Sequence, residues 1–286
     1  MAFRFTGFAD EASRSLDEQI EVTRQAGWSS IELRMIGDKN VCALEPAEWR
    51  EVWDKLQKGG ITVAGFGSAL CNWSRPITND FQVDLDDLRR AIPYMREANC
   101  NLIRIMSYPN DKNNPLPREE WRAEVIRRLK ELCRIAEGEG IILGHENCNG
   151  YASQGPAEFL DIAEQLDSPA FKMIFDTGNT TGHDGKGYEG TWDFYERCRD
   201  FIVHVHIKSF RKNEEGKWKT CWPDEDPVQR KILQDLKNRG YDGWLSIEPH
   251  LAAAVHANVQ SKDKDYSKRI YLEYTKRLEN LVNSLD

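Results

Sequence analysis

The sequence predicts an α/β protein, a single (β/α)8 (TIM) barrel that spans residues 1–286 as one domain. Strand-like and helix-like segments alternate strictly along the chain, and this alternation implies parallel strands joined by right-handed crossovers. Eight such units close a barrel, and 286 residues lie just above the ~250 that are typical of one. Two joints also look alike. AGWSSIELR (26–34) and RGYDGWLSIEP (239–249) both run from glycine through an aromatic residue into a strand with a glutamate near its end.

The first half of the chain contains four strand–helix units. Each strand is a short apolar run, each helix has an amphipathic charge pattern, and glycine often separates the two. Pro93 predicts a bend in the third helix, and the proline-rich segment 108–117 predicts a loop. In chain order the pairs are strand 3–8 with helix 15–27, strand 30–34 with helix 45–60, strand 61–68 with helix 80–100, and strand 101–107 with helix 118–140.

The second half repeats this rhythm with two longer loops. The glycine-rich segment 177–190 and the charged segment 209–226 are both expected to be loops. An open doubly wound sheet is the alternative, but no Gly-x-Gly-x-x-Gly turn follows the first strand. The remaining pairs are strand 141–147 with helix 155–168, strand 171–176 with helix 191–200, strand 201–208 with helix 227–240, and strand 243–249 with helix 264–284.

Composition excludes several classes of partner. Lys and Arg number 39 against 47 Asp and Glu, and a net charge of −8 disfavours binding to nucleic acid. No stretch reaches the ~18 apolar residues of a membrane span, and the N-terminus shows no cleavage pattern. The seven cysteines are widely spaced without a Cys-x-x-Cys pair. Structural thiols in a reducing compartment are therefore expected, and the chain is predicted to be cytoplasmic.

Polar residues of metal-binding type stand where four consecutive strands end. Active sites of TIM barrels are built at this end of the strands, so only such residues count as candidates. Any one of them could have a structural role, with Asp176 capping a helix or His206 sitting in the core. Four together favour a common site over the barrel axis. The four are Glu146 in the phrase LGHENCNG, Asp176, His206 and Glu248.

Three carboxylates and one imidazole suit a divalent metal ion. Carboxylates held close together have raised pKa values unless a cation neutralises them. Mn²⁺ fits this oxygen-rich set best, and Mg²⁺, Co²⁺ and Zn²⁺ are alternatives. His204 shares the parity of His206 but lies one layer deeper, as a supporting or a core residue. Arg104, between apolar neighbours, is expected either to pair with a carboxylate such as Glu32 or to clamp substrate hydroxyls.

At these residues the sequence resembles the xylose-isomerase-like TIM-barrel superfamily, which includes sugar isomerases and epimerases, inosose dehydratase and endonuclease IV. The resemblance covers essentially the whole chain, and the family's metal set of Glu, Asp, His and Glu matches Glu146, Asp176, His206 and Glu248. The phrases HEN, FDTGN, HVHIKS and IEPHL are most similar to a branch that acts on 3-keto-glycosides, the 3-dehydroglycoside epimerases and the metal-binding subunits of C-glycoside deglycosidases. Many other members have His where Asn179 stands and Lys-Asp where this chain has Lys208-Ser209.

The resemblance implies a sugar isomerase or epimerase that abstracts a proton next to a carbonyl of a keto-sugar or 3-keto-glycoside. A metal would polarise the carbonyl, and Glu146 and Glu248 would serve both as ligands and as the acid/base pair. His145 is an additional base candidate, although strand alternation turns it away from Glu146. One alternative is a lyase or dehydratase that uses the same enolate. Another is a non-catalytic sugar-binding subunit of a larger enzyme. A homo-oligomer or a partner subunit is compatible with each of these functions. The residues expected at the substrate are Arg104, Asn179, Lys208 and His250.

Overall fold

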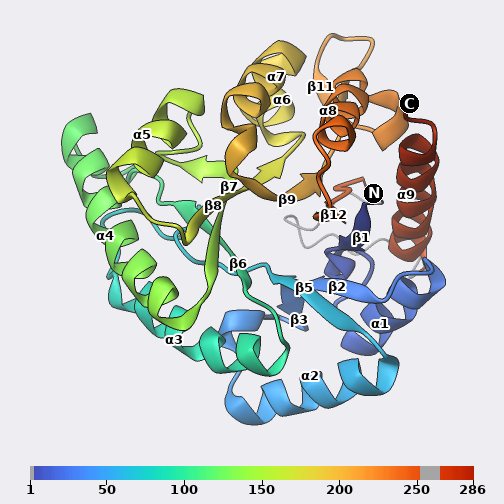
Figure 1. Cartoon of the computed structure of the whole chain (residues 1–286), viewed down its shortest axis with the longest axis horizontal. Helices are drawn as coiled ribbons and strands as arrows, with labels where there is room; N and C mark the ends of the chain where they lie inside the picture. The colour runs from blue at the N-terminus through green and yellow to red at the C-terminus, as the bar shows by residue number, and fades with distance from the viewer. Residues whose placement is uncertain (1–2, 252–264) are drawn as a thin grey trace.

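Eight parallel strands form the central sheet of the protein, as the sequence predicts. The computed structural model describes residues 3–251 and 265–286. From β2 to β12 each barrel strand pairs with the next one along the chain, and the last, β12, pairs with the first, β1. β1 and β2 end this row and contact each other, so the sheet curls into a nearly closed barrel (Figure 1). The strands are β1 Arg4–Gly7, β2 Ser30–Leu33, β5 Thr62–Phe66, β6 Leu102–Ser107, β7 Ile142–Gly150, β8 Phe171–Asp176, β9 Ile202–Ile207 and β12 Trp244–Ile247.

Helices surround the barrel, and their ends follow local sequence signals (Figure 1). Pro46 opens α2, where Glu45 and Glu48 form a capping box, and Gly60 ends it in the left-handed conformation with φ 68°. Pro227 opens α8, where Asp226 accepts hydrogen bonds from two backbone amides of the first turn. The helices that follow the barrel strands are α1 Leu16–Gln25, α2 Pro46–Gly59, α3 Gln82–Glu97, α4 Arg118–Glu139, α5 Pro156–Leu166, α7 Gly187–Cys198, α8 Pro227–Asn238 and α9 Tyr266–Asn283.

Several segments differ from the sequence prediction in detail. β7 continues to Gly150 instead of ending at Asn147. The predicted loop 177–190 contains a short helix, α6 Asn179–Gly182, and the start of α7. The charged loop 209–226 folds into an antiparallel hairpin of β10 Phe210–Lys212 and β11 Trp218–Thr220. A smaller hairpin of β3 Met35–Ile36 and β4 Lys39–Asn40 follows β2, and α3 continues through Pro93.

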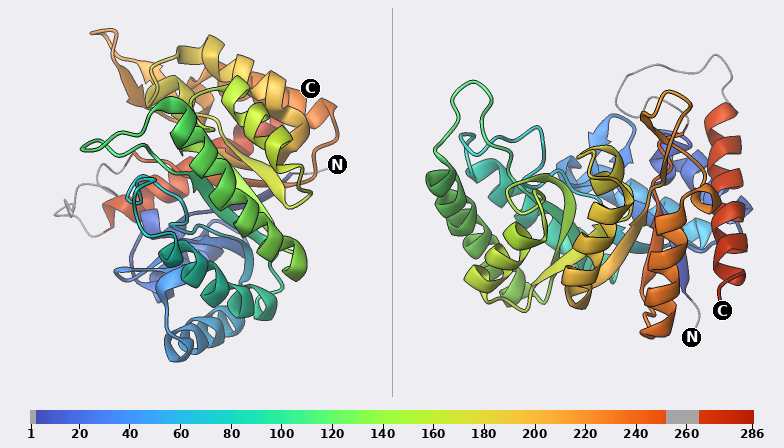
Figure 2. Two further views of the ribbon diagram at one scale, coloured as in Figure 1. Left: turned by 90° about the vertical axis from the view of Figure 1, so that its left-hand side faces the viewer. Right: turned by 90° about the horizontal axis from the view of Figure 1, so that it is seen from above.

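The two ends of the barrel differ in what they carry. The loop 108–117 and the β10–β11 hairpin project from the end where the strands exit, whereas both termini lie toward the opposite end (Figure 2). The end where the strands exit is therefore where the predicted site residues should meet.

Within residues 3–251 and 265–286, no helix combines the length and the apolar character that crossing a membrane requires.

Candidate metal centre

Four side chains of metal-binding type converge at the carboxyl ends of four consecutive barrel strands. We call them the quartet: Glu146 on β7, Asp176 at the end of β8, His206 on β9 and Glu248 directly after β12. One potential ligand atom of each lies within 4.8 Å of those of the other three, and all four residues are at most 3% exposed. The structure thus brings together the four residues that the strand-exit rule selected.

His206 lies between Glu146 and Glu32. Its Nε2 is 3.2 Å from Glu32 Oε1, and its Nδ1 is 3.5 Å from Glu146 Oε1. Burial alone would lower the pKa of His206, but these two carboxylates raise it to about 10. His204 points into the same network, with Nε2 2.9 Å from Glu32 Oε2, and it is not a member of the quartet.

Lys208 places a buried cation directly beside the quartet. Its Nζ lies 2.7 Å from Glu248 Oε2 and 3.2 Å from Asp176 Oδ2. Asn179 joins this group, because its Oδ1 accepts a hydrogen bond from Lys208 Nζ at 3.1 Å and its Nδ2 donates to Glu146 Oε1 at 3.2 Å. Burial lowers the pKa of Lys208, but the carboxylates more than offset this and raise it above its usual range.

Arg104 reaches the quartet from β6, next to β7. Its Nη1 donates to Glu146 Oε2 at 3.1 Å and its Nη2 to the carbonyl oxygen of Ser68 at 3.1 Å. A carboxylate does pair with Arg104, as one sequence interpretation expected, but the partner is Glu146 rather than Glu32. Burial would raise the pKa of Glu146, and Arg104 is the main group that instead lowers it, to about 2. Glu146 is therefore ionised at neutral pH.

Residues that follow β1 and β2 also lie beside the quartet, and sequence reasoning did not select them. Arg34, just after β2, lies 2.5 Å from Glu248 through Nη1 and 2.9 Å from Asp10 through Nε. Its Nη2 is 3.5 Å from Glu11. Asp10 and Glu11 follow β1 in the phrase GFADE, and Arg34 follows β2, so the strand-exit rule applied to these two strands would have found them.

His250 adjoins Glu11 and Glu248 in a left-handed backbone conformation, with φ 50°. Its amide donates to Glu11 Oε2 at 2.9 Å, and its Nε2 lies 3.2 Å from Glu248 Oε1. Burial lowers the pKa of His250 to about 4, so the imidazole is neutral at pH 7. The structure therefore brings His250 to the quartet, together with Arg104, Asn179 and Lys208.

His145 and Cys148 adjoin Glu146 in sequence, but neither belongs to the quartet. The imidazole of His145 is 3.0 Å from Ser107 Oγ and packs near the rings of Phe159 and Phe171, on the other face of β7. Burial lowers its pKa to about 4. Strand alternation thus separates His145 from the quartet. Burial also raises the pKa of the Cys148 thiol, which remains protonated.

The chemistry of this cluster fits a divalent cation. The cluster contains six buried carboxyl groups. The permanently charged cations described beside these groups are Arg34, Arg104 and Lys208. Burial, with help from neighbouring carboxylates, raises the pKa of Glu11 to about 8 and that of Asp176 to about 6. Together with the raised pKa of His206, these directions indicate a deficit of positive charge. The six acids are Asp10, Glu11, Glu32, Glu146, Asp176 and Glu248.

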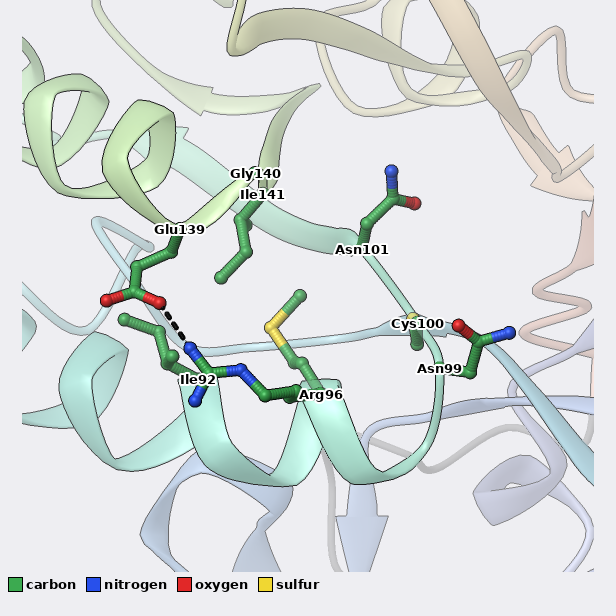
Figure 3. A pocket seen from close by; sticks show the side chains of 9 residues that line it. Ile92, Arg96, Asn99, Cys100, Asn101, Glu139, Gly140 and Ile141 are labelled. Carbon is green, nitrogen blue, oxygen red and sulfur yellow. Dashed lines mark hydrogen bonds and ion pairs between the residues drawn. The ribbon is translucent and has the colours of Figure 1, made fainter.

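A separate cavity of about 390 Å³ lies at the opposite end of the barrel. Figure 3 shows the side chains that line it. It is lined by residues at the end of α3 and by residues that precede β6 and β7. Its polar lining includes Asn99, Asn101 and an ion pair between Arg96 and Glu139, 2.6 Å apart. The cavity contains no residue of the quartet, and it lies at the end of a barrel that contributes to stability rather than to catalysis.

The chain belongs to the xylose isomerase-like TIM barrel family, whose model matches residues 20–269. The sequence is 30% identical over 154 residues to an uncharacterized protein of Methanocaldococcus jannaschii, covering 51% of this chain and 46% of that protein. It is 24% identical over 206 residues to D-psicose 3-epimerase of Enterocloster bolteae, covering 68% and 63%. The chain therefore spans about half to three fifths of the length of these curated relatives. An inosose dehydratase of Mesomycoplasma hyopneumoniae is 22% identical over 296 residues, covering 95% and 89%.

Solved structures share the same architecture over nearly the whole chain. The 3-keto-D-glucoside 4-epimerase from E. coli superposes with a TM-score of 0.66 at 14% identity, covering 99% of this chain and 100% of that one. A xylose isomerase-like TIM barrel protein from Mycobacterium smegmatis, in complex with magnesium, superposes with a TM-score of 0.70 at 14% identity, covering 98% and 97%. At these identities the likeness establishes the fold alone.

Proposed function

We propose that this protein is a divalent-metal-dependent sugar isomerase or epimerase. The reaction would move a proton at the carbon next to a carbonyl in a keto-sugar or 3-keto-glycoside. The observation that carries this proposal is the pair of buried carboxylates, Glu146 and Glu248, which reach one point from the non-adjacent strands β7 and β12. The D-psicose 3-epimerase and the 3-keto-D-glucoside 4-epimerase among the similar proteins support the substrate class.

A bound metal would act as a Lewis acid on the carbonyl of the substrate. One of Glu146 and Glu248 would then take a proton from one face of the sugar. The other, after gaining a proton from solvent, would deliver it to the opposite face, and the first would release its proton to solvent. The pKa of each supports this role, because burial would raise both but neighbouring cations hold both below the usual range. Both groups are thus ionised before substrate binds, and either one is able to accept the proton.

Side chains beside the quartet would bind the sugar hydroxyls. We assign this role to Lys208, Asn179 and His250, which offer an ammonium group, an amide and a neutral imidazole at the quartet. Arg104, at 3% exposure, is paired with Glu146 and Ser68, and its proposed part is to hold Glu146 ionised and oriented. His145 has no part in this proposal, because its side chain lies on the other face of β7.

Among divalent ions we propose Mn²⁺. Three carboxylates and one imidazole match its preference, and Mg²⁺ is the nearest competitor because a structural neighbour was solved with it. A cytoplasmic location, and either self-association or a partner subunit, remain predictions from the sequence.

A dehydratase or lyase is the second candidate function. The inosose dehydratase that aligns with 95% of this chain favours it. The two reactions share the first proton abstraction, and they differ in whether a leaving group lies on the next carbon. A non-catalytic sugar-binding subunit is less well supported, because all four residues of the quartet are present and converge.

Solvent isotope exchange tests the proposed function. Mn²⁺-loaded protein incubated with a 3-keto-glucoside in D₂O should place deuterium at the carbon beside the ketone. Glu248→Gln should slow this by the ~10²–10⁴-fold typical of a general acid/base, and more if metal is lost as well, so bound metal is measured in parallel. Glu164→Gln, at an exposed position on α5, is the matched control and should exchange at the wild-type rate. Neither exchange nor product with ketoses, inososes and 3-keto-glycosides, while metal is bound, would contradict the proposal.

A further inference from the structure

Glu32 is a buried carboxylate outside the quartet, and it contacts His206, the one histidine of the quartet. Glu32 on β2 is 1% exposed, and its two oxygens face three donors from two other strands. His204 and His206 approach through Nε2 at 2.9 Å and 3.2 Å, and Ser246 Oγ donates at 2.5 Å. β2 contributes no ligand to the quartet, so this contact reaches the site from outside the four ligand strands.

These contacts determine where the proton of His206 sits. An ionised carboxylate only accepts hydrogen bonds, so the nitrogen that faces Glu32 must carry hydrogen. In the neutral imidazole the proton is therefore on Nε2 and the lone pair is on Nδ1. Nδ1 makes no hydrogen bond with any residue that the structure describes, and it points toward Glu146 Oε1, 3.5 Å away.

Packing contacts also hold the orientation of the His206 ring. Phe8 packs against the His206 ring edge-on, with centroids 5.0 Å apart, and His204 packs against it at 5.4 Å. Rotating the ring to present Nε2 to the quartet would remove the hydrogen bond to Glu32 and leave a buried carboxylate oxygen with one donor fewer. Packing and hydrogen bonding thus favour the same orientation.

We infer that Glu32 is a positioning residue, which holds His206 with Nε2 protonated so that Nδ1 is the atom that binds the metal. The inference rests on the proposed function, because it requires the quartet to bind a divalent ion. Metal-binding histidines commonly donate their second nitrogen to a carboxylate, which fixes the tautomer and makes the ligand more basic. Loss of such a partner typically weakens metal binding about 10–100-fold.

Metal binding by variants tests this role without any measurement of activity. Chelator-treated protein is titrated with Mn²⁺, and free ion is followed by electron paramagnetic resonance. Glu32→Gln keeps the shape of the side chain but removes its charge, and it should weaken Mn²⁺ binding about 10–100-fold. Ser246→Ala is the matched control, because it removes one hydrogen bond to Glu32 and leaves both imidazole contacts. It should bind Mn²⁺ within about threefold of wild type.

Nitrogen NMR of the wild-type protein tests the assignment even if Glu32→Gln fails to fold. In Zn²⁺-loaded protein labelled with ¹⁵N-histidine, His206 should show a protonated Nε2 and a metal-bound Nδ1. Zinc on Nε2, or wild-type Mn²⁺ affinity in Glu32→Gln, would overturn the inference and leave the proposed function standing. Two metal ions per chain would also overturn it, because the second would lie between Glu32 and the two imidazoles. A wild-type protein that binds no divalent ion would overturn both.

Discussion

Asp226 is the N-cap of α8, and its carboxyl group is buried. It is 2% exposed and accepts hydrogen bonds from the amides of Val228, Gln229 and Phe210. Burial nevertheless raises its pKa from 3.8 to about 6. Between these two values the folded protein holds a proton that the unfolded chain releases. The stability from this proton is complete below about pH 3.8 and is lost as the pH rises through about 6.

We therefore expect Asp226→Asn to change how stability depends on pH. In the wild type, loss of the Asp226 proton should lower the free energy of unfolding by about 1–2 kcal/mol as the pH rises from 5 to 7.5. Asparagine does not titrate, so Asp226→Asn should lack this decrease. Urea unfolding at the two pH values measures it. Asp80→Asn is the control, because Asp80 accepts from the Gln82 amide at an exposed helix start. An unchanged pH dependence in Asp226→Asn would show that the carboxyl group is ionised throughout.

Single residues also mark how far the site could be predicted. The quartet could be found because position at a strand exit and side-chain chemistry are both visible in the sequence. The partner of Arg104 could not be found, because it depends on which strands are neighbours and on their register. β6 pairs with β7, so Arg104 meets Glu146, whereas Glu32 faces donors on β9 and β12. Asp10 and Glu11 follow β1 and Arg34 follows β2, so the same rule applies to these three residues as well.

At the scale of elements, the end of β7 depends on a glycine. Gly150 has φ 97° and pairs with Ser107 of β6 just after a register shift. A Cβ atom there would lie 2.4 Å from the Ser107 carbonyl carbon and 2.6 Å from its oxygen. Neither atom is able to move freely, since both belong to the backbone of a buried strand. Only glycine fits this conformation and this close approach.

Gly150→Ala should therefore destabilise the protein by about 2–4 kcal/mol, from overpacking and from the strained φ together. Gly138→Ala in α4 is the matched control, because a Cβ there would have nothing within 4 Å. That change should stabilise by about 0.5–1 kcal/mol through helix propensity. Guanidinium unfolding of both variants measures the difference. Equal stability of the two would mean that β7 shifts easily at its exit.

Elements with strong local signals matched the prediction, and those without them did not. Strand-like runs such as 101–107 and 171–176 agree with β6 and β8 within one residue. The β10–β11 hairpin was missed because its sequence is charged and has no alternating pattern. Its short strands depend on pairing with each other and on Tyr188, whose hydroxyl donates to the Phe210 carbonyl at 2.9 Å. Such tertiary contacts leave no periodic trace in the sequence.

At the scale of the whole molecule, the barrel brings like charges together at its centre. Strict alternation predicted parallel strands with right-handed crossovers, and the eight units and the missing Gly-x-Gly-x-x-Gly turn favoured a barrel over an open sheet. The same closure collects carboxylates from strands far apart in sequence, including Glu32, Glu146 and Glu248. Folding without a metal must therefore oppose electrostatic repulsion that a bound cation would relieve.

Metal binding should thus be visible as a stabilisation of the whole fold. A ligand that binds only the folded state, and is present at 100 times its dissociation constant, stabilises the fold by about 2.7 kcal/mol. This corresponds to roughly 4–5 °C in Tm for a chain of this size. Calorimetry of chelator-treated protein with and without saturating Mn²⁺ measures the shift. Asp176→Asn removes a ligand charge and should abolish most of it, whereas Asp193→Asn, exposed on α7, should retain it. If Mn²⁺, Mg²⁺, Co²⁺ and Zn²⁺ all leave the wild-type Tm unchanged, the quartet is balanced by Lys208 and the arginines alone and binds no metal.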